Sequence, residues 1–181
     1  DNYYTPDYLT PQKLHSIREM ISCLACVNKE SPKVLTLASS TATCIKEIYK
    51  LYPKAKITNI ERDERVLKEY EKLKFKTENH LIDLKKFVKI SDLDFDFINL
   101  DLMGHAGNSK GEIFKAINNK SSCKFVSVNF TYSKKFRISK DFPFMKEVTK
   151  KYSKEDDQVL KYVEDCFSNF RLIKQFKYKR N

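Results

Sequence analysis

Glycine is scarce in this chain: three occur among 181 residues, and all of them lie between positions 104 and 111. Tryptophan is absent, and no apolar run approaches the roughly 18 residues that a membrane-spanning helix needs. A signal peptide is not visible either, so we expect an intracellular, cytoplasmic protein that does not bind membranes. Because the chain begins at Asp1 and not at Met, we interpret it as part of a larger chain or complex.

The five cysteines do not follow the spacing of a disulfide framework. Cys23 and Cys26 form a lone Cys-x-x-Cys pair inside a predicted helix, without a second pair or a nearby histidine to complete a zinc site. We interpret the cysteines as small buried hydrophobes in a reducing compartment. No cluster of histidine, cysteine and carboxylate residues appears in the sequence, so we expect no metal site.

Basic residues outnumber acidic ones, with 35 Lys and Arg against 24 Asp and Glu and a formal net charge of +11. This surplus favours a polyanionic partner such as nucleic acid, although a solvated lysine-rich face produces the same count. The length predicts a single domain, and 41% hydrophobic residues are enough for a buried core. Within it we expect an N-terminal arm and helix at 1–30, followed by an α/β unit at 31–181.

The region from Lys33 to Glu61 has the pattern of a strand, a helix and a second strand. An apolar, strand-forming run at 33–38 is followed by helical spacing at 41–52 and by a second strand at 56–60. Such a βαβ unit predicts two parallel strands. Glu61 ends the second strand, where folds of this kind bind ribose, and its carboxylate can accept hydrogen bonds from vicinal hydroxyls. Alternatively, Glu61 stabilises the first turn of the next helix.

Helices and strands continue to alternate in the rest of the chain. The alternation predicts an α/β fold with a doubly wound, mostly parallel sheet that binds ligands outside the carboxyl ends of its strands. Thr10 and Pro11 mark the start of an N-terminal helix. Further helices are expected at 62–73, near 83–87, near 113–117, at 144–152 and from 153 onward, and further strands at 78–82, 95–100, 123–130 and 170–178.

Four features fall at the carboxyl ends of the predicted strands: the turn at 38–43, Glu61, Asp83 and Asp101. With these features the region 33–132 resembles the class I, Rossmann-like S-adenosylmethionine-dependent methyltransferases. The resemblance implies S-adenosylmethionine as cofactor, with the turn around its methionine part, Glu61 on the ribose and Asp83 near the adenine. Asp83 is alternatively only the N-cap of the next helix. The implied cofactor-binding residues are Ala38, Ser39, Ser40, Thr41, Glu61 and Asp83.

The turn departs from the glycine-rich pattern of this family. Thr36 stands where the family has an acid, and Ala38, Ser40 and Ala42 stand where it has glycines. All three replacements are small, so a ligand can still approach closely, but alanine and serine disfavour the positive φ that glycine permits. The family also ends in an antiparallel hairpin, of which only the strand at 170–178 is visible, so we expect a truncated hairpin.

Asp101 opens a loop that contains every glycine of the chain, beginning with Asp-Leu-Met-Gly. This Asp-x-x-Gly pattern resembles the motif of tRNA guanine-N2 methyltransferases, although Leu102 and Met103 replace its proline and aromatic residue. The resemblance implies that Asp101 is catalytic and orients the acceptor amine, while Gly104 and His105 contact the substrate. One alternative is a flexible connector with Asp101 as a helix cap. Another is a phosphate-binding P-loop, which needs a Gly-Lys-Ser/Thr order that is absent.

Two basic segments, 134–140 and 171–180, interleave Lys and Arg with aromatic residues, a composition typical of nucleic-acid binding. Lysines that guard an edge strand produce the same pattern. We predict that Lys134, Lys135 and Arg137 contact the substrate.

Three functions are compatible with these patterns. We hypothesise an S-adenosylmethionine-dependent methyltransferase that acts on nucleic acid, on RNA rather than DNA. The alternative is a catalytically inactive domain of the same fold that serves as a nucleic-acid-binding or assembly module of a larger protein. A third hypothesis, a nucleotide- or NAD-binding enzyme of the Rossmann type, lacks the Gly-x-Gly-x-x-Gly turn that it requires.

Overall fold

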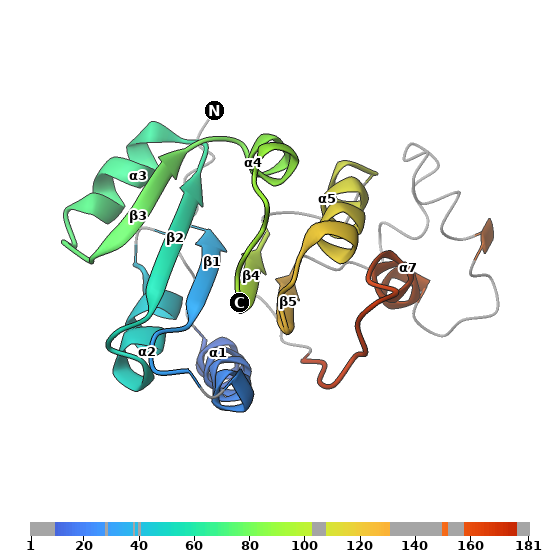
Figure 1. Ribbon diagram of the computed structural model, residues 1–181, viewed down its shortest axis with the longest axis horizontal. Helices are drawn as coiled ribbons and strands as arrows, with labels where there is room; N and C mark the ends of the chain where they lie inside the picture. Colours follow the sequence, from blue (N-terminus) through green and yellow to red (C-terminus); the bar gives the residue numbers. More distant parts are fainter. Residues whose placement is uncertain are drawn as a thin grey trace.

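The computed structural model describes residues 10–27, 29–37, 39, 41–102, 108–130, 150–151 and 158–176. A single five-stranded sheet lies at the centre of the described structure, with the strand order β3-β2-β1-β4-β5 (Figure 1). Every neighbouring pair of strands is parallel. The predicted doubly wound α/β fold is therefore confirmed. The strands are β1 (Lys33–Leu37), β2 (Lys56–Glu61), β3 (Thr77–Leu81), β4 (Phe97–Asp101) and β5 (Phe125–Asn129).

Side-chain caps fix the starts of three helices, as the sequence predicts for two of them. Thr10 accepts a hydrogen bond from the Lys13 amide at 3.1 Å, Asp63 accepts one from Arg65, and Asp83 caps the helix that follows β3. The helices are α1 (Pro11–Ser22), the 3-10 helix η1 (Cys23–Val27), α2 (Thr43–Leu51), α3 (Glu64–Glu71), α4 (Leu84–Ile90), α5 (Asn108–Lys120) and α7 (Gln158–Cys166). Among the described residues, none of these helices could cross a membrane, because none is both long and apolar enough.

The sheet separates two hydrophobic cores, because successive side chains of a strand point to opposite faces. Val34 and Ile57 point toward α1, α2 and α3 and belong to one core. Leu35 and Ile98 point the other way and pack with residues of α4, α5 and α7. Figure 1 shows α1 and α2 together near β1, and α5 and α7 on the side of β5. The helices cover both faces, which leaves the ends of the strands for ligands.

The prediction of a strand at 170–178 is wrong for the part that the structure describes, which ends at residue 176. Residues 171–176 are exposed and have no strand pairing. Lys174 instead forms an ion pair with Glu19 on α1, so this segment lies against a helix and not beside the sheet. The alternation of basic and apolar residues there reflects an exposed segment. The helix predicted at 144–152 lies mostly outside the described residues, whereas the helix predicted from 153 onward is confirmed over its described part as α7.

Gly111 has a packing role that the sequence did not reveal. It is the last of the three glycines that the sequence predicts in the loop after Asp101, yet it lies inside α5, where it is buried. A Cβ atom at this position would lie 1.8 Å from the hydroxyl oxygen of Tyr162 on α7. The absence of a side chain therefore leaves room for the Tyr162 side chain against the backbone of α5. Gly111 is not part of the acceptor loop that we expected.

Asp96 fixes the amino end of the sheet. Its carboxylate accepts hydrogen bonds from the Lys29 ammonium at 2.5 Å and from the Lys33 amide at 2.9 Å. Burial alone would raise the pKa of Asp96, but the hydrogen bonds and charges of Lys29 and Lys33 outweigh it and lower the pKa below its ordinary value of 3.8. A depressed carboxylate pKa stabilises the fold above the unfolded pKa, and this stabilisation is lost as the pH falls through the folded pKa.

The variant Asp96→Asn should lower the free energy of unfolding at neutral pH by about 2 kcal/mol, because it removes a charged acceptor. In urea titrations the difference from the wild type should shrink as the pH falls below 3.8 and through the lower pKa of folded Asp96, because protonated Asp96 is also neutral. Asp94→Asn is the matched control, since its ion pair with Lys33 is exposed and should contribute little. A difference that persists unchanged at low pH would contradict this account.

Candidate functional site

The strand order reverses at β1, which lies between β2 and β4. In doubly wound sheets the crevice at such a reversal, outside the carboxyl ends of the strands, is the usual ligand site. Three chain segments meet there: the turn after β1, the end of β2 at Glu61 and the end of β4 at Asp101. The candidate site is built from these three.

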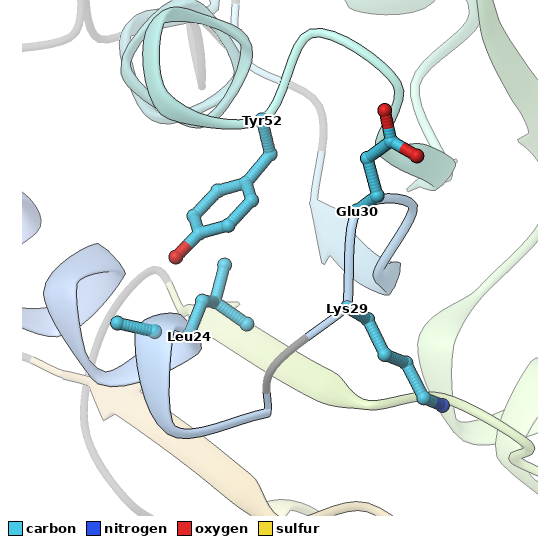
Figure 2. Close-up of a pocket in the computed structure, with 5 residues that line it drawn as sticks. Leu24, Lys29, Glu30 and Tyr52 are labelled. Atoms are coloured by element: carbon cyan, nitrogen blue, oxygen red, sulfur yellow. The ribbon is translucent and has the colours of Figure 1, made fainter.

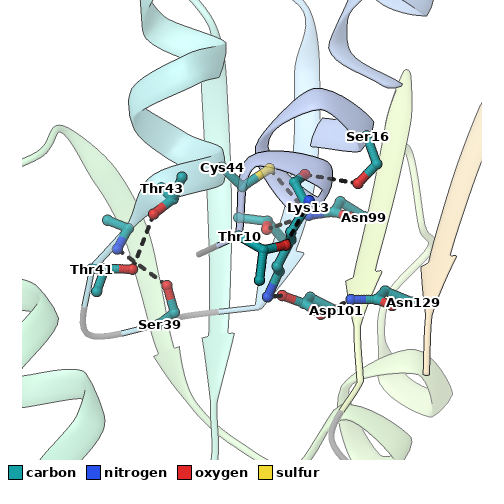
Figure 3. Close-up of polar contacts among 12 residues, drawn as sticks. Thr10, Lys13, Ser16, Ser39, Thr41, Thr43, Cys44, Asn99, Asp101 and Asn129 are labelled. Carbon is teal, nitrogen blue, oxygen red and sulfur yellow. Dashed lines mark hydrogen bonds and ion pairs between the residues drawn. The ribbon is translucent and has the colours of Figure 1, made fainter. Parts of the chain in front are cut away.

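The turn after β1 is closed by its own side chains (Figure 3). The amide of Ala42 donates to the hydroxyl oxygen of Ser39 at 3.1 Å and to its carbonyl oxygen at 3.2 Å. The hydroxyl oxygens of Thr41 and Thr43 lie 3.1 Å apart. Hydroxyl groups thus surround the start of α2. Ala38 and Ser40, the other two predicted turn residues, lie outside the described residues.

Ala42 is the residue on which the shape of the turn depends. It immediately precedes α2, makes no side-chain cap, and has a left-handed backbone with φ 51° and ψ 32°. A residue with a Cβ pays about 1–2 kcal/mol for this conformation. Ala42 is only 2% exposed, so its methyl group is held inside the core. The turn therefore follows a path that glycine would adopt more easily, and the surrounding packing maintains it.

Substitution of Ala42 by Gly should be tolerated better than Ala55→Gly, although both alanines are buried. Both changes remove a buried methyl group and loosen the unfolded chain, but only Ala42→Gly relieves a positive φ. We expect the free energies of unfolding of the two variants to differ by about 1–2 kcal/mol in favour of Ala42→Gly. Equal losses in chemical denaturation would mean that the turn stores no strain.

Glu61 ends β2, and its carboxylate is turned back onto its own chain. Oε1 accepts the amides of Arg62 at 2.7 Å and Asp63 at 2.8 Å. In the part of the chain that the structure describes, no donor contacts Oε2. The hydrogen bonds from these two backbone amides fix the orientation of the carboxylate, so that Oε1 is engaged and Oε2 is available to a ligand.

Asp83 caps α4. Its Oδ1 accepts the amides of Lys85 at 2.9 Å and Lys86 at 3.3 Å. This is the alternative that the sequence left open for Asp83. The contact accounts for the residue without a ligand, and its role near an adenine stays a prediction.

Asp101 is held by two residues that the sequence did not point to (Figure 3). Lys13, on α1, donates to Oδ2 at 3.0 Å, and Asn129, at the end of β5, donates to Oδ1 at 2.6 Å. The side chain of Lys13 is 14% exposed and that of Asp101 is 39% exposed, so the pair lies at the edge of the core. Since each carboxylate oxygen can accept more than one hydrogen bond, Asp101 retains acceptor capacity.

Asn129 could have been found from the sequence, because it lies near the end of the strand predicted at 123–130, and the structure pairs this position with Asp101. Lys13 could not, since no local pattern connects α1 with a residue 88 positions away. Gly104, His105, Lys134, Lys135 and Arg137, the predicted substrate-contacting residues, lie outside the described residues.

A hollow of about 290 Å³ lies at the opposite end of the sheet (Figure 2). Lys29 and Glu30, which precede β1, and Tyr52, which follows α2, contribute to its lining. It therefore lies at the amino ends of the strands and is separate from the candidate site. Over the same described residues, no three His, Cys, Asp or Glu side chains come together as metal ligands.

Solved structures, in contrast to sequence families, resemble this chain. No family model matches it, and no curated protein matches it. The plantazolicin methyltransferase BamL, in complex with a triazolic desmethylPZN analog and S-adenosylhomocysteine (SAH), superposes with a TM-score of 0.53 at 10% identity, covering 86% of this chain and 55% of that chain. A Staphylococcus aureus protein described as a caffeoyl-CoA O-methyltransferase gives a TM-score of 0.50 at 12% identity, covering 90% and 74%.

The chain has the fold of the class I S-adenosylmethionine-dependent methyltransferases. A Corynebacterium glutamicum protein described as a spermidine synthase shares this fold, with a TM-score of 0.53 at 13% identity over 65% of this chain and 46% of that one. The chain spans about half the length of the first solved structures that it matches. The predicted resemblance to the methyltransferase fold is thus confirmed.

Proposed function

We propose that the chain is a methyltransferase domain that binds S-adenosylmethionine at the carboxyl ends of β1, β2 and β4 and methylates nucleic acid, with RNA preferred over DNA. The observation that carries the cofactor part of this proposal is the position of Glu61. Its carboxylate stands at the end of β2, beside the reversal of strand order, with Oε1 fixed by two amides. The other oxygen can then accept a hydrogen bond from a ribose hydroxyl.

The turn at 39–42 would hold the methionine part of the cofactor. Ser39 and Thr41 offer hydroxyl groups at the start of α2, and Ala42 takes the left-handed backbone conformation that glycine adopts readily. Ala38 and Ser40 complete this predicted turn. Asp83 would lie nearer the adenine, in addition to its capping of α4.

Asp101 would place the methyl acceptor. The bound cofactor supplies a methyl group that is already electrophilic, so positioning of the acceptor contributes most of the acceleration. Lys13 and Asn129 fix the plane of the Asp101 carboxylate from two sides. A lone pair that remains on the carboxylate can accept an N–H of the acceptor amine and aim the nitrogen at the methyl carbon. His105 and Gly104 belong to the same proposed acceptor region.

The nucleic-acid part of the proposal rests on charge. A net charge of +11 favours a polyanion, and the predicted contacts Lys134, Lys135 and Arg137 form part of the basic segment after β5. The solved structures named above are not described as acting on nucleic acid, so the acceptor must be tested directly.

The second candidate function is an inactive domain of the same fold that serves as a binding or assembly module. One observation favours it: both oxygens of Asp101 and one oxygen of Glu61 already have partners within the chain. Such contacts stabilise a fold whether or not a ligand binds.

SAH binding and methyl transfer separate the two functions. With SAH at 100 times its dissociation constant, the wild type should be stabilised by about 2.7 kcal/mol in thermal unfolding. Asp101→Asn should keep this stabilisation but lose transfer of labelled methyl from S-adenosylmethionine to total RNA. The asparagine side chain has one acceptor oxygen in place of two, so it cannot accept hydrogen bonds from both Lys13 and the acceptor amine in the same geometry. Asp94→Asn, an exposed acid near the other end of β4, should retain both activities.

The acceptor is identified by parallel reactions with total RNA, genomic DNA and a small-molecule extract. Labelling of RNA that weakens steeply with added salt supports the proposal, because contacts to phosphates release counterions. Labelling confined to the extract would overturn the nucleic-acid part. A wild type that SAH does not stabilise would favour the inactive module.

A further inference from the structure

A row of buried polar side chains crosses the sheet one layer below the candidate site. Thr36, Asn59 and Asn99 are 1%, 0% and 5% exposed, and they come from β1, β2 and β4. Thr36 is paired with Asn59 in the strand register, and Asn99 reaches Thr36 by a hydrogen bond. Buried faces of parallel sheets are usually apolar, and burial of an amide is unfavourable unless its hydrogen bonds are made. The row therefore needs an explanation other than core packing.

Asn99 joins three elements through one amide group. Its Nδ2 donates to the hydroxyl oxygen of Thr36 on β1 at 3.3 Å and to the sulfur of Cys44 on α2 at 3.2 Å. Figure 3 shows Asn99 and Cys44 above the Lys13–Asp101 contact in that view, next to α1. Because side chains alternate along a strand, Asn99 lies on the same face as Asp101, two residues before it. The amide thus ties the strand of the acceptor acid to both ends of the cofactor turn.

Helix α2 has particular need of this support. It begins after a left-handed Ala42 and has no side-chain cap. Its first helical hydrogen bond runs from the Lys46 amide to the Ala42 carbonyl at 2.9 Å. Cys44 lies within this first turn, so the Asn99–Cys44 contact anchors the turn to the sheet from the inside.

We propose that Asn99 is a positioning residue, which fixes the turn at 39–42 and the first turn of α2 relative to Asp101. In this role it sets the distance between the donor and acceptor halves of the site. The inference rests on the proposed function for its catalytic meaning, but its structural part does not depend on a bound cofactor.

The variant Asn99→Leu tests this role, because leucine has a similar size and cannot donate. Asn118→Leu is the matched control. Asn118 is also a buried asparagine, 7% exposed, but it lies on α5, on the other side of the sheet. Its side-chain oxygen accepts a hydrogen bond from the backbone amide of Asn169 at 2.7 Å. Both variants are expected to lose thermal stability. Only Asn99→Leu should speed hydrogen exchange in the first turn of α2, by about tenfold or more relative to the control.

In the same experiment SAH affinity is measured at a temperature at which both variants are folded. Asn99→Leu should weaken SAH binding by about tenfold, and Asn118→Leu should leave it unchanged. The double variant Thr36→Val with Asn99→Leu should bind SAH almost as tightly as Asn99→Leu alone, because Thr36 and Asn99 are partners in one hydrogen bond that Asn99→Leu already removes. Equal hydrogen exchange at α2 in both variants would overturn the inference. If exchange at α2 is faster in Asn99→Leu than in Asn118→Leu but the wild type does not bind SAH, the inference stands and the proposed function is rejected.

Discussion

The parallel pairing of β1 with both β2 and β4 is the constraint on which the rest of the structure depends. In this arrangement the chain must cross from one half of the sheet to the other after β3, and the helices must cover both faces. The carboxyl ends of β1, β2 and β4 are then neighbours. This brings together, at one edge of the sheet, the turn after β1 and the carboxylates of Glu61 and Asp101, which are far apart in the sequence.

The polar residues at this edge are held by a neutral layer beneath them. Asn99 and Thr36 form hydrogen bonds across strands inside the core, and Cys44 joins α2 to them. Above this layer Lys13 and Asn129 hold Asp101. Lys13, whose side chain is only 14% exposed, is paired with Asp101, and the groups beneath this pair are uncharged, which avoids the cost of a buried unpaired charge.

Much of the fold could be predicted from the sequence because hydrophobic periodicity changes clearly between strands and helices. The positions of Glu61 and Asp101 at the ends of strands could be predicted for the same reason, since each ends an apolar run, and their roles in binding stay predictions. Lys13 and Cys44 could not be found, because their roles depend on contacts between elements distant in the chain. The segment at 171–176 was misread, because alternating basic and apolar residues resemble an edge strand whether or not a sheet is nearby. Gly111 was misread because close packing of α7 against α5 has no local signal.

The central claim is that the crevice beside β1 is a cofactor site, and a crystal structure of the protein grown with SAH tests it most directly. The account predicts density for the nucleoside at the carboxyl ends of β1 and β2, with the ribose hydroxyls within hydrogen-bond distance of the Glu61 carboxylate. Density at another place, or a crevice that stays without SAH although the ligand is present in large excess, would contradict it.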